Sequence, residues 1–86
     1  MTREEILNHI IGLNLQVAPD VDKNDNIVGW VVGQVKYDRG LGCALVHNKD
    51  IARGTTLEEA ITNLINGHTI WNTEIAPIHN SIRESV

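Results

Sequence analysis

Residues 51–67, IARGTTLEEAITNLING, decide the fold, because a strand end, a helix start and a helix stop follow one another in this stretch. Thr55 and Thr56 each stand three residues ahead of a glutamate, and either pair matches the capping box that begins a helix. Glu58 and Glu59 are therefore predicted to be structural, since carboxylates also favour the positive end of the helix dipole. The apolar residues that follow share one helix face: Leu57, Ala60, Ile61, Leu64 and Ile65. The closing glycine supplies the left-handed residue at which such a helix ends.

Similar patterns place further elements ahead of this segment. Thr2 and Glu5 form another capping box, which predicts a short first helix. Residues 13–18 alternate between apolar and polar, so we expect a strand with one buried face that ends at Pro19. A polar loop is predicted over residues 20–26.

Residues 27–37, IVGWVVGQVKY, form the strongest predicted strand, because β-branched and aromatic residues fill it. Both of its faces are apolar for most of its length, which indicates a central strand covered above and below. Gly29 and Gly33 lie on one of these faces. They predict a close approach there by a helix, or alternatively a bulge.

Two turns divide the middle of the chain. Residues 38–40 have a tight-turn sequence and lead into a predicted strand over residues 41–47. A second turn at residues 48–49 leads into a short strand at residues 51–53.

A last helix is predicted near the end of the chain, with Thr73 as its cap and Pro77 in its first turn, where a missing N–H costs little. Its apolar stripe consists of Ile75, Ile78 and Ile82. The sequence thus predicts one α+β domain over residues 1–86, with helices at both ends of the chain and a small antiparallel sheet of three or four strands, in the order α-β-β-β-(β)-α-α. With helices available for both faces of the sheet, a three-layer α/β/α sandwich fits the two-faced central strand.

Composition narrows the classes of function. A formal net charge of −4 argues against a nucleic-acid surface held by phosphate contacts, for which a basic patch is expected. The single cysteine, Cys43, has no partner for an internal disulfide, and no apolar run is long enough to span a membrane. We therefore expect a cytoplasmic protein that does not bind membranes.

No residue pattern predicts catalysis, a metal site or a cofactor. Cys43 stands at strand spacing between Leu41 and Leu45, which favours a small core residue over a nucleophile paired with His47. The histidines lack the pairwise spacing of a zinc motif. No glycine-rich loop opens a helix as a phosphate site requires. We expect a binding protein rather than an enzyme.

Three residues are predicted to contact a partner: Tyr37, Arg39 and Trp71. Tyrosine, arginine and tryptophan are the commonest hot-spot residues of interfaces. The turns over residues 36–53 also concentrate most of the positive charge, whereas carboxylates gather in the loop over residues 20–26 and at the helix starts, a polarity that can orient a partner. Which of these regions forms the interface is left open, and ordinary solvated turns are the alternative. Trp71 is expected to be exposed or half-exposed, and Trp30 to belong mostly to the core.

Two resemblances bear on function. Residues 54–61, GTTLEEAI, preceded by the Gly29-Trp30 strand, resemble the strand-to-helix signature of HicB-type antitoxin domains. The opening residues 2–6, TREEI, together with the tryptophan-containing strand and the capped helix, are similar to small phage-encoded domains of the ABA-sandwich type. The second resemblance implies a fold and a mobile-element origin without a defined activity.

These observations predict a small phage- or prophage-type protein that binds a host or phage protein, as an inhibitor or accessory factor acting by steric occlusion. The alternative is a HicB-like antitoxin module that neutralises a basic ribonuclease through its acidic loop and helix start. Free edge strands would also suit a homodimer.

Overall fold

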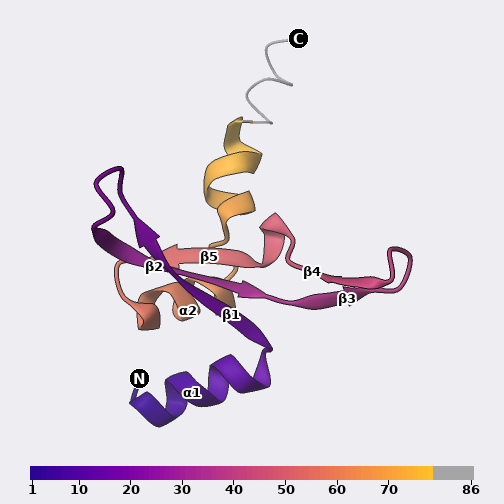
Figure 1. Ribbon diagram of the computed structural model, residues 1–86, viewed down its shortest axis with the longest axis horizontal. Helices are drawn as coiled ribbons and strands as arrows, with labels where there is room; N and C mark the ends of the chain where they lie inside the picture. Colours follow the sequence, from indigo (N-terminus) through magenta and orange to yellow (C-terminus); the bar gives the residue numbers. More distant parts are fainter. Residues whose placement is uncertain (79–86) are drawn as a thin grey trace.

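The computed structural model describes residues 1–78 of the chain, and its elements confirm the α+β class (Figure 1). Their order roughly matches the predicted one, with five strands among the described residues in place of three or four. The elements are α1 (Arg3–Gly12), β1 (Leu15–Val21), β2 (Ile27–Gln34), β3 (Lys36–Asp38), β4 (Cys43–Leu45), the 3-10 turn η1 (Asn48–Asp50), β5 (Ile51–Gly54), α2 (Leu57–Ile65) and the π-helical turn η2 (Trp71–Ile75). The predicted stripe residue Ile82 lies outside the described residues.

The strands form two separate units. An antiparallel sheet has the order β1-β2-β5, and β3 pairs only with β4. The long strand predicted over residues 27–37 is therefore divided at Val35. The N–H of Val35 donates to the carbonyl of Asn14 (3.1 Å), just beyond the terminal pair Leu15–Gln34 of the β1–β2 ladder. Asn14 adopts the left-handed conformation (φ 54°), and β1 begins after it. Beyond Val35 the strand leaves the sheet and pairs with β4.

Both long helices cover the same face of the sheet. The fully buried core of the described chain consists of Val32, Ala52, Ala60 and Ile61. Half-buried side chains from α1, α2 and the sheet pack against it: Ile6, Ile10, Leu15, Trp30, Leu57 and Leu64. Figure 1 shows α1 and α2 on the same, lower side of the sheet.

Residues 1–78 thus form two layers, and the three-layer alternative is not their arrangement. Four fully buried hydrophobic side chains make one small core in this part of the chain, on the side of the sheet that the helices cover.

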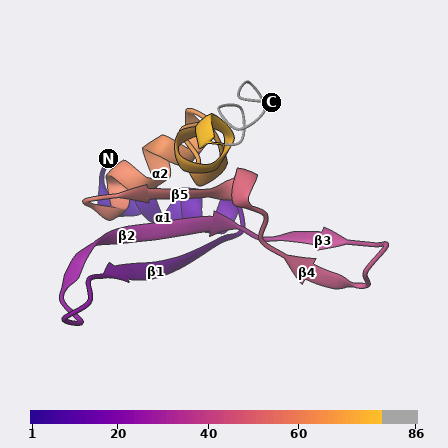
Figure 2. The same ribbon diagram turned by 90° about the horizontal axis from the view of Figure 1, so that it is seen from above.

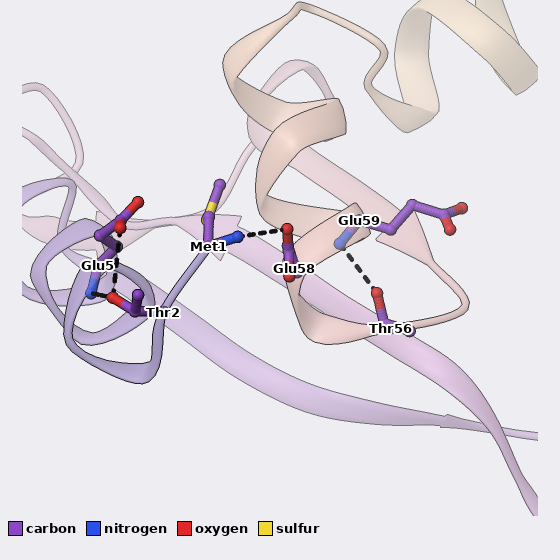
Figure 3. Close-up of polar contacts among 6 residues, drawn as sticks. All are labelled: Met1, Thr2, Glu5, Thr56, Glu58 and Glu59. Atoms are coloured by element: carbon purple, nitrogen blue, oxygen red, sulfur yellow. Dashed lines mark hydrogen bonds and ion pairs between the residues drawn. The ribbon is translucent and has the colours of Figure 1, made fainter.

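The threonine half of both predicted capping boxes forms (Figure 3). The Thr2 hydroxyl accepts from the N–H of Glu5 (3.2 Å), and the Thr56 hydroxyl accepts from the N–H of Glu59 (3.1 Å). Of the two threonines that precede α2, Thr56 is the N-cap. Thr55 instead donates its hydroxyl hydrogen to the Glu59 carboxylate (2.8 Å).

Glu58 joins the starts of the two helices. Its Oε1 accepts from the Met1 ammonium group at 2.7 Å (Figure 3). This hydrogen bond raises the pKa of the ammonium group above its ordinary value. The structural role predicted for the glutamates at the start of α2 agrees with these contacts.

Pro19 does not end the first strand, contrary to the prediction. β1 continues through Pro19 to Val21, and Pro19 lies opposite Trp30 of β2. In an antiparallel ladder the backbone N–H groups point alternately toward and away from the neighbouring strand. Because Asn14 faces β2, this alternation turns the nitrogen of Pro19 toward the free edge, where no N–H is needed. The polar loop therefore begins later, at Asp22.

The last helical segment also differs from the prediction. It begins after Thr69, whose hydroxyl accepts from the N–H of Asn72 (3.4 Å), and Thr73 lies inside it and donates to the carbonyl of Thr69 (2.8 Å). Pro77 consequently lies beyond the first turn, contrary to the prediction. The N–H of the residue before it reaches back five residues to the carbonyl of Trp71. A wide π turn of this kind relieves the clash between a proline ring and the carbonyl four residues earlier.

Candidate interaction surface

A two-stranded arm, residues 36–45, projects from the body of the protein (Figures 1 and 2). Its strands are β3 and β4, three residues each, with Tyr37 opposite Ala44. Asp38 holds the connecting turn, because its carbonyl accepts from the N–H of Gly42 (2.8 Å) and its carboxylate from the N–H of Leu41 (3.1 Å). Gly42 adopts the left-handed conformation (φ +69°) that the turn requires.

Large side chains on the arm are exposed. Tyr37 is 66% exposed and Leu41 68%, and Arg39 lies exposed in the turn. The structure therefore places two of the three predicted contact residues on one projecting feature. Cys43 is also exposed, so the prediction that it is a core residue is wrong. The strand that carries it pairs outside the main sheet, and the body of the protein buries neither of its faces.

Trp71 lies at the base of the arm. It lines a shallow hollow whose residues we call the Trp71 patch: Lys36, His47, Asn48, Lys49, Asp50 and Trp71. The Lys49 Nζ lies 5.4 Å from the centre of the Trp71 ring. At an exposed site such a cation–π contact contributes about 0.5–1 kcal/mol. Trp71 is half-buried, as predicted, and Trp30 packs partly against the core.

The cations of this region differ in whether a carboxylate of the described residues pairs with them. The Lys36 Nζ pairs with the Asp50 carboxylate at 3.0 Å. No carboxylate of residues 1–78 lies within ion-pair distance of Arg39 or Lys49. Arg53, which the sequence grouped with the basic turns, instead faces Glu74 of η2 at 3.9 Å. The positive charges of residues 36–53 therefore do not form a single patch.

The opposite end of the molecule is acidic. The loop after β1 and the start of α2 both lie at the end away from the arm (Figure 1). Asp22 fixes the loop, since its Oδ1 accepts from the N–H groups of Asn26 (3.0 Å) and Asn24 (2.8 Å). These two hydrogen bonds lower the pKa of the Asp22 carboxyl below its ordinary value.

Leu41 was not predicted to be a contact residue, and Lys49 was predicted only as one of the positive charges of residues 36–53, without its contact to Trp71. Leu41 stands between Gly40 and Gly42, and this turn context is a signal that could have indicated exposure. The position of Lys49 over Trp71 depends on the folding of η2 beside η1, and no local pattern encodes it.

Within residues 1–78, no three histidine, cysteine, aspartate or glutamate side chains are placed to hold a metal ion. No helix in that part of the chain is long and apolar enough to cross a membrane. Comparison with models of protein families, with curated proteins and with solved structures found no match.

Proposed function

We propose that the protein acts by binding another protein, and that the arm and the Trp71 patch are its contact surface. The observation that carries this proposal is the arm itself. A hairpin with strands of three residues is at best marginally stable alone in water, yet this one presents Tyr37 and Leu41 to solvent. Burial in a partner would stabilise the arm and remove its apolar surface from water.

The chemistry of the surface defines the kind of partner. Tyr37 and Trp71 are aromatic anchors of the type that dominates binding energy. Arg39 and Lys49 add cations without a carboxylate partner among the described residues. A complementary surface would be an apolar cleft with carboxylates at its rim.

Binding of this kind needs no turnover. The protein would occlude the partner's surface, as an inhibitor or accessory factor in the cytoplasm. The resemblance to phage-encoded domains makes a host protein the expected target.

The proposal is tested by capture from a bacterial host lysate, followed by binding curves with the purified partner. We expect Tyr37→Ala and Trp71→Ala each to weaken binding about tenfold or more, the usual loss when a hot-spot residue is truncated. Ile11→Ala is the matched control, because Ile11 is an exposed large hydrophobic residue on α1. A partner that binds all three variants as tightly as the parent protein would exclude the arm and the Trp71 patch.

The acidic end supports a second candidate, a HicB-like antitoxin module. The Asp22 loop and the first turn of α2 share that end, and together they suit a basic ribonuclease (Figure 1). Asp25→Asn removes a charge and keeps a residue type that tolerates the left-handed conformation found there (φ 63°). Loss of toxin neutralisation by Asp25→Asn, with Tyr37→Ala unaffected, would favour this candidate over the first.

A further inference from the structure

The face of the sheet opposite the helices is open and largely apolar. Figure 2 looks onto this face, with α1 behind the strands. A shallow hollow on it is lined by Gln16, Ala18, Val31, Gly33, Val46 and Ile51. Val46 is the one of these that comes from outside the sheet. It fills the space above Gly33, where an added Cβ would lie 2.8 Å from the Val46 Cγ1.

One side chain does not cover the whole face. Val31 and Ile51 stay half-buried, and Ala18 is exposed. The residues of β2 alternate between the two faces, and both sets are apolar, which is the pattern of a strand buried on both sides. The described chain buries the Val32 side of β2 and leaves the Val31 side without a second layer.

Charged residues stand on the two opposite edge strands of this face. Asp20 lies on β1 and is paired with Gly29, whereas Arg53 lies on β5 and is paired with Val31. β2 separates them, so they are about 10 Å apart across two strand spacings. Opposite charges on opposite edges make the face complementary to itself.

We infer that a second copy of this chain packs on the open face, sheet against sheet. A two-fold axis running along β2 places β1 of each copy over β5 of the other. The apolar centres then meet, and Asp20 of each copy approaches Arg53 of the other, so that the interface is isologous and carries two equivalent ion pairs. Aligned packing of this kind is a common way for two sheets to stack.

Two further features agree with this arrangement. η2, the orange to yellow coil, stands beside β5 and rises on the open side of the sheet (Figures 1 and 2), where it would flank the β1 edge of the second copy. The contact between Arg53 and Glu74 is long, at 3.9 Å, and both side chains are about half-exposed. A pair of this kind contributes little to stability, so Arg53 can exchange Glu74 for Asp20 of the second copy.

Sedimentation equilibrium of the full chain over a wide concentration range tests the inference. We expect a dimer, and we expect Ala18→Arg to raise its dissociation constant about tenfold or more, because a charge would be buried without a partner. Val17→Arg is the matched control, because Val17 directly precedes Ala18 in β1 and points to the opposite face of the sheet. The Val17 side chain is already 37% exposed there. Circular dichroism verifies that each variant is folded.

A charge exchange distinguishes a second copy from any other occupant. Asp20→Lys and Arg53→Asp should each weaken the dimer, and the double variant should restore it. A chain that stays monomeric at all concentrations, a dimer that Ala18→Arg leaves intact, or a double variant as weak as the single ones would each overturn the inference. Tyr37→Ala should leave the dimer unchanged, because the arm lies outside this face.

Discussion

At the residue scale, Gly29 and Gly54 stand where another segment of backbone approaches closely. Gly54 is the clearest case, because an added Cβ would lie 2.4 Å from the backbone nitrogen of Ala60. The absence of a side chain at this position lets the first turn of α2 pack directly on β5. The sequence placed Gly54 between a strand and a helix, but it gave no sign of this contact, which depends on how α2 folds back over the sheet.

Gly54→Ala is therefore expected to destabilise the protein by about 1–3 kcal/mol, the usual cost of overpacking, since backbone rather than a flexible side chain would have to move. Urea unfolding measures the change. Gly12→Ala is the control, because nothing lies within 4 Å of a Cβ at that position. It should leave stability unchanged or raise it by up to about 1 kcal/mol. Equal stability of the two variants would refute the contact.

Asp22 makes the stability of the folded protein depend on pH. Its pKa is lowered in the folded state, so its contribution is fully present above the ordinary value of about 3.9 and is lost as the pH falls through the lowered value. The stability difference between the parent protein and Asp22→Asn should accordingly be constant near neutral pH and shrink below about pH 4. Unfolding curves between neutral and strongly acidic pH measure it, and a difference that grows in acid would contradict the assignment.

At the element scale, the local signals at the ends of α2 were reliable, whereas Thr73 was wrongly assigned as a cap and the long-range strand pairings were not predicted. The start and end of α2 follow from neighbouring residues, and both were predicted. The division of the long strand at Val35 was not, because it depends on where β1 begins on the other side of the sheet. Pro19 was misjudged for a related reason, since only the register shows that its nitrogen faces a free edge. That α1 and α2 lie on the same face of the sheet likewise depends on packing between elements, so neighbouring residues did not predict it.

The two threonines ahead of α2 provide a test at this scale. Thr56→Ala should cost about 1 kcal/mol, because its hydroxyl accepts the bond from the N–H of Glu59. Thr55→Ala should cost less, since the Thr55 hydroxyl contacts only the exposed Glu59 carboxylate. Thermal unfolding of both variants decides the order, and a larger loss for Thr55→Ala would show that the cap is misassigned.

At the scale of the whole molecule, few of the large hydrophobic side chains of residues 1–78 are fully buried and many are exposed. Two large side chains, Ile61 and Val32, are fully buried in the described part, while Tyr37, Leu41 and other large hydrophobic residues are more than a third exposed. The candidate contact residues Tyr37 and Arg39 could be chosen from the sequence because they are hot-spot residue types that lie in or next to the predicted turn over residues 38–40. The projection of the arm from the sheet could not be predicted from the sequence, because it follows from the separate pairing of β3 with β4.

The central claim, that the arm is the surface that binds a partner, is tested most directly by amide hydrogen exchange on the free protein and on the complex recovered from a host lysate. In the free protein the amides of residues 36–45 should exchange faster than those of the β1-β2-β5 sheet, because the strands of the arm are short and the body does not cover them. In the complex, exchange in the arm and around Trp71 should slow markedly. Slowing confined to the Asp22 loop and the start of α2, with the arm unchanged, would contradict the claim.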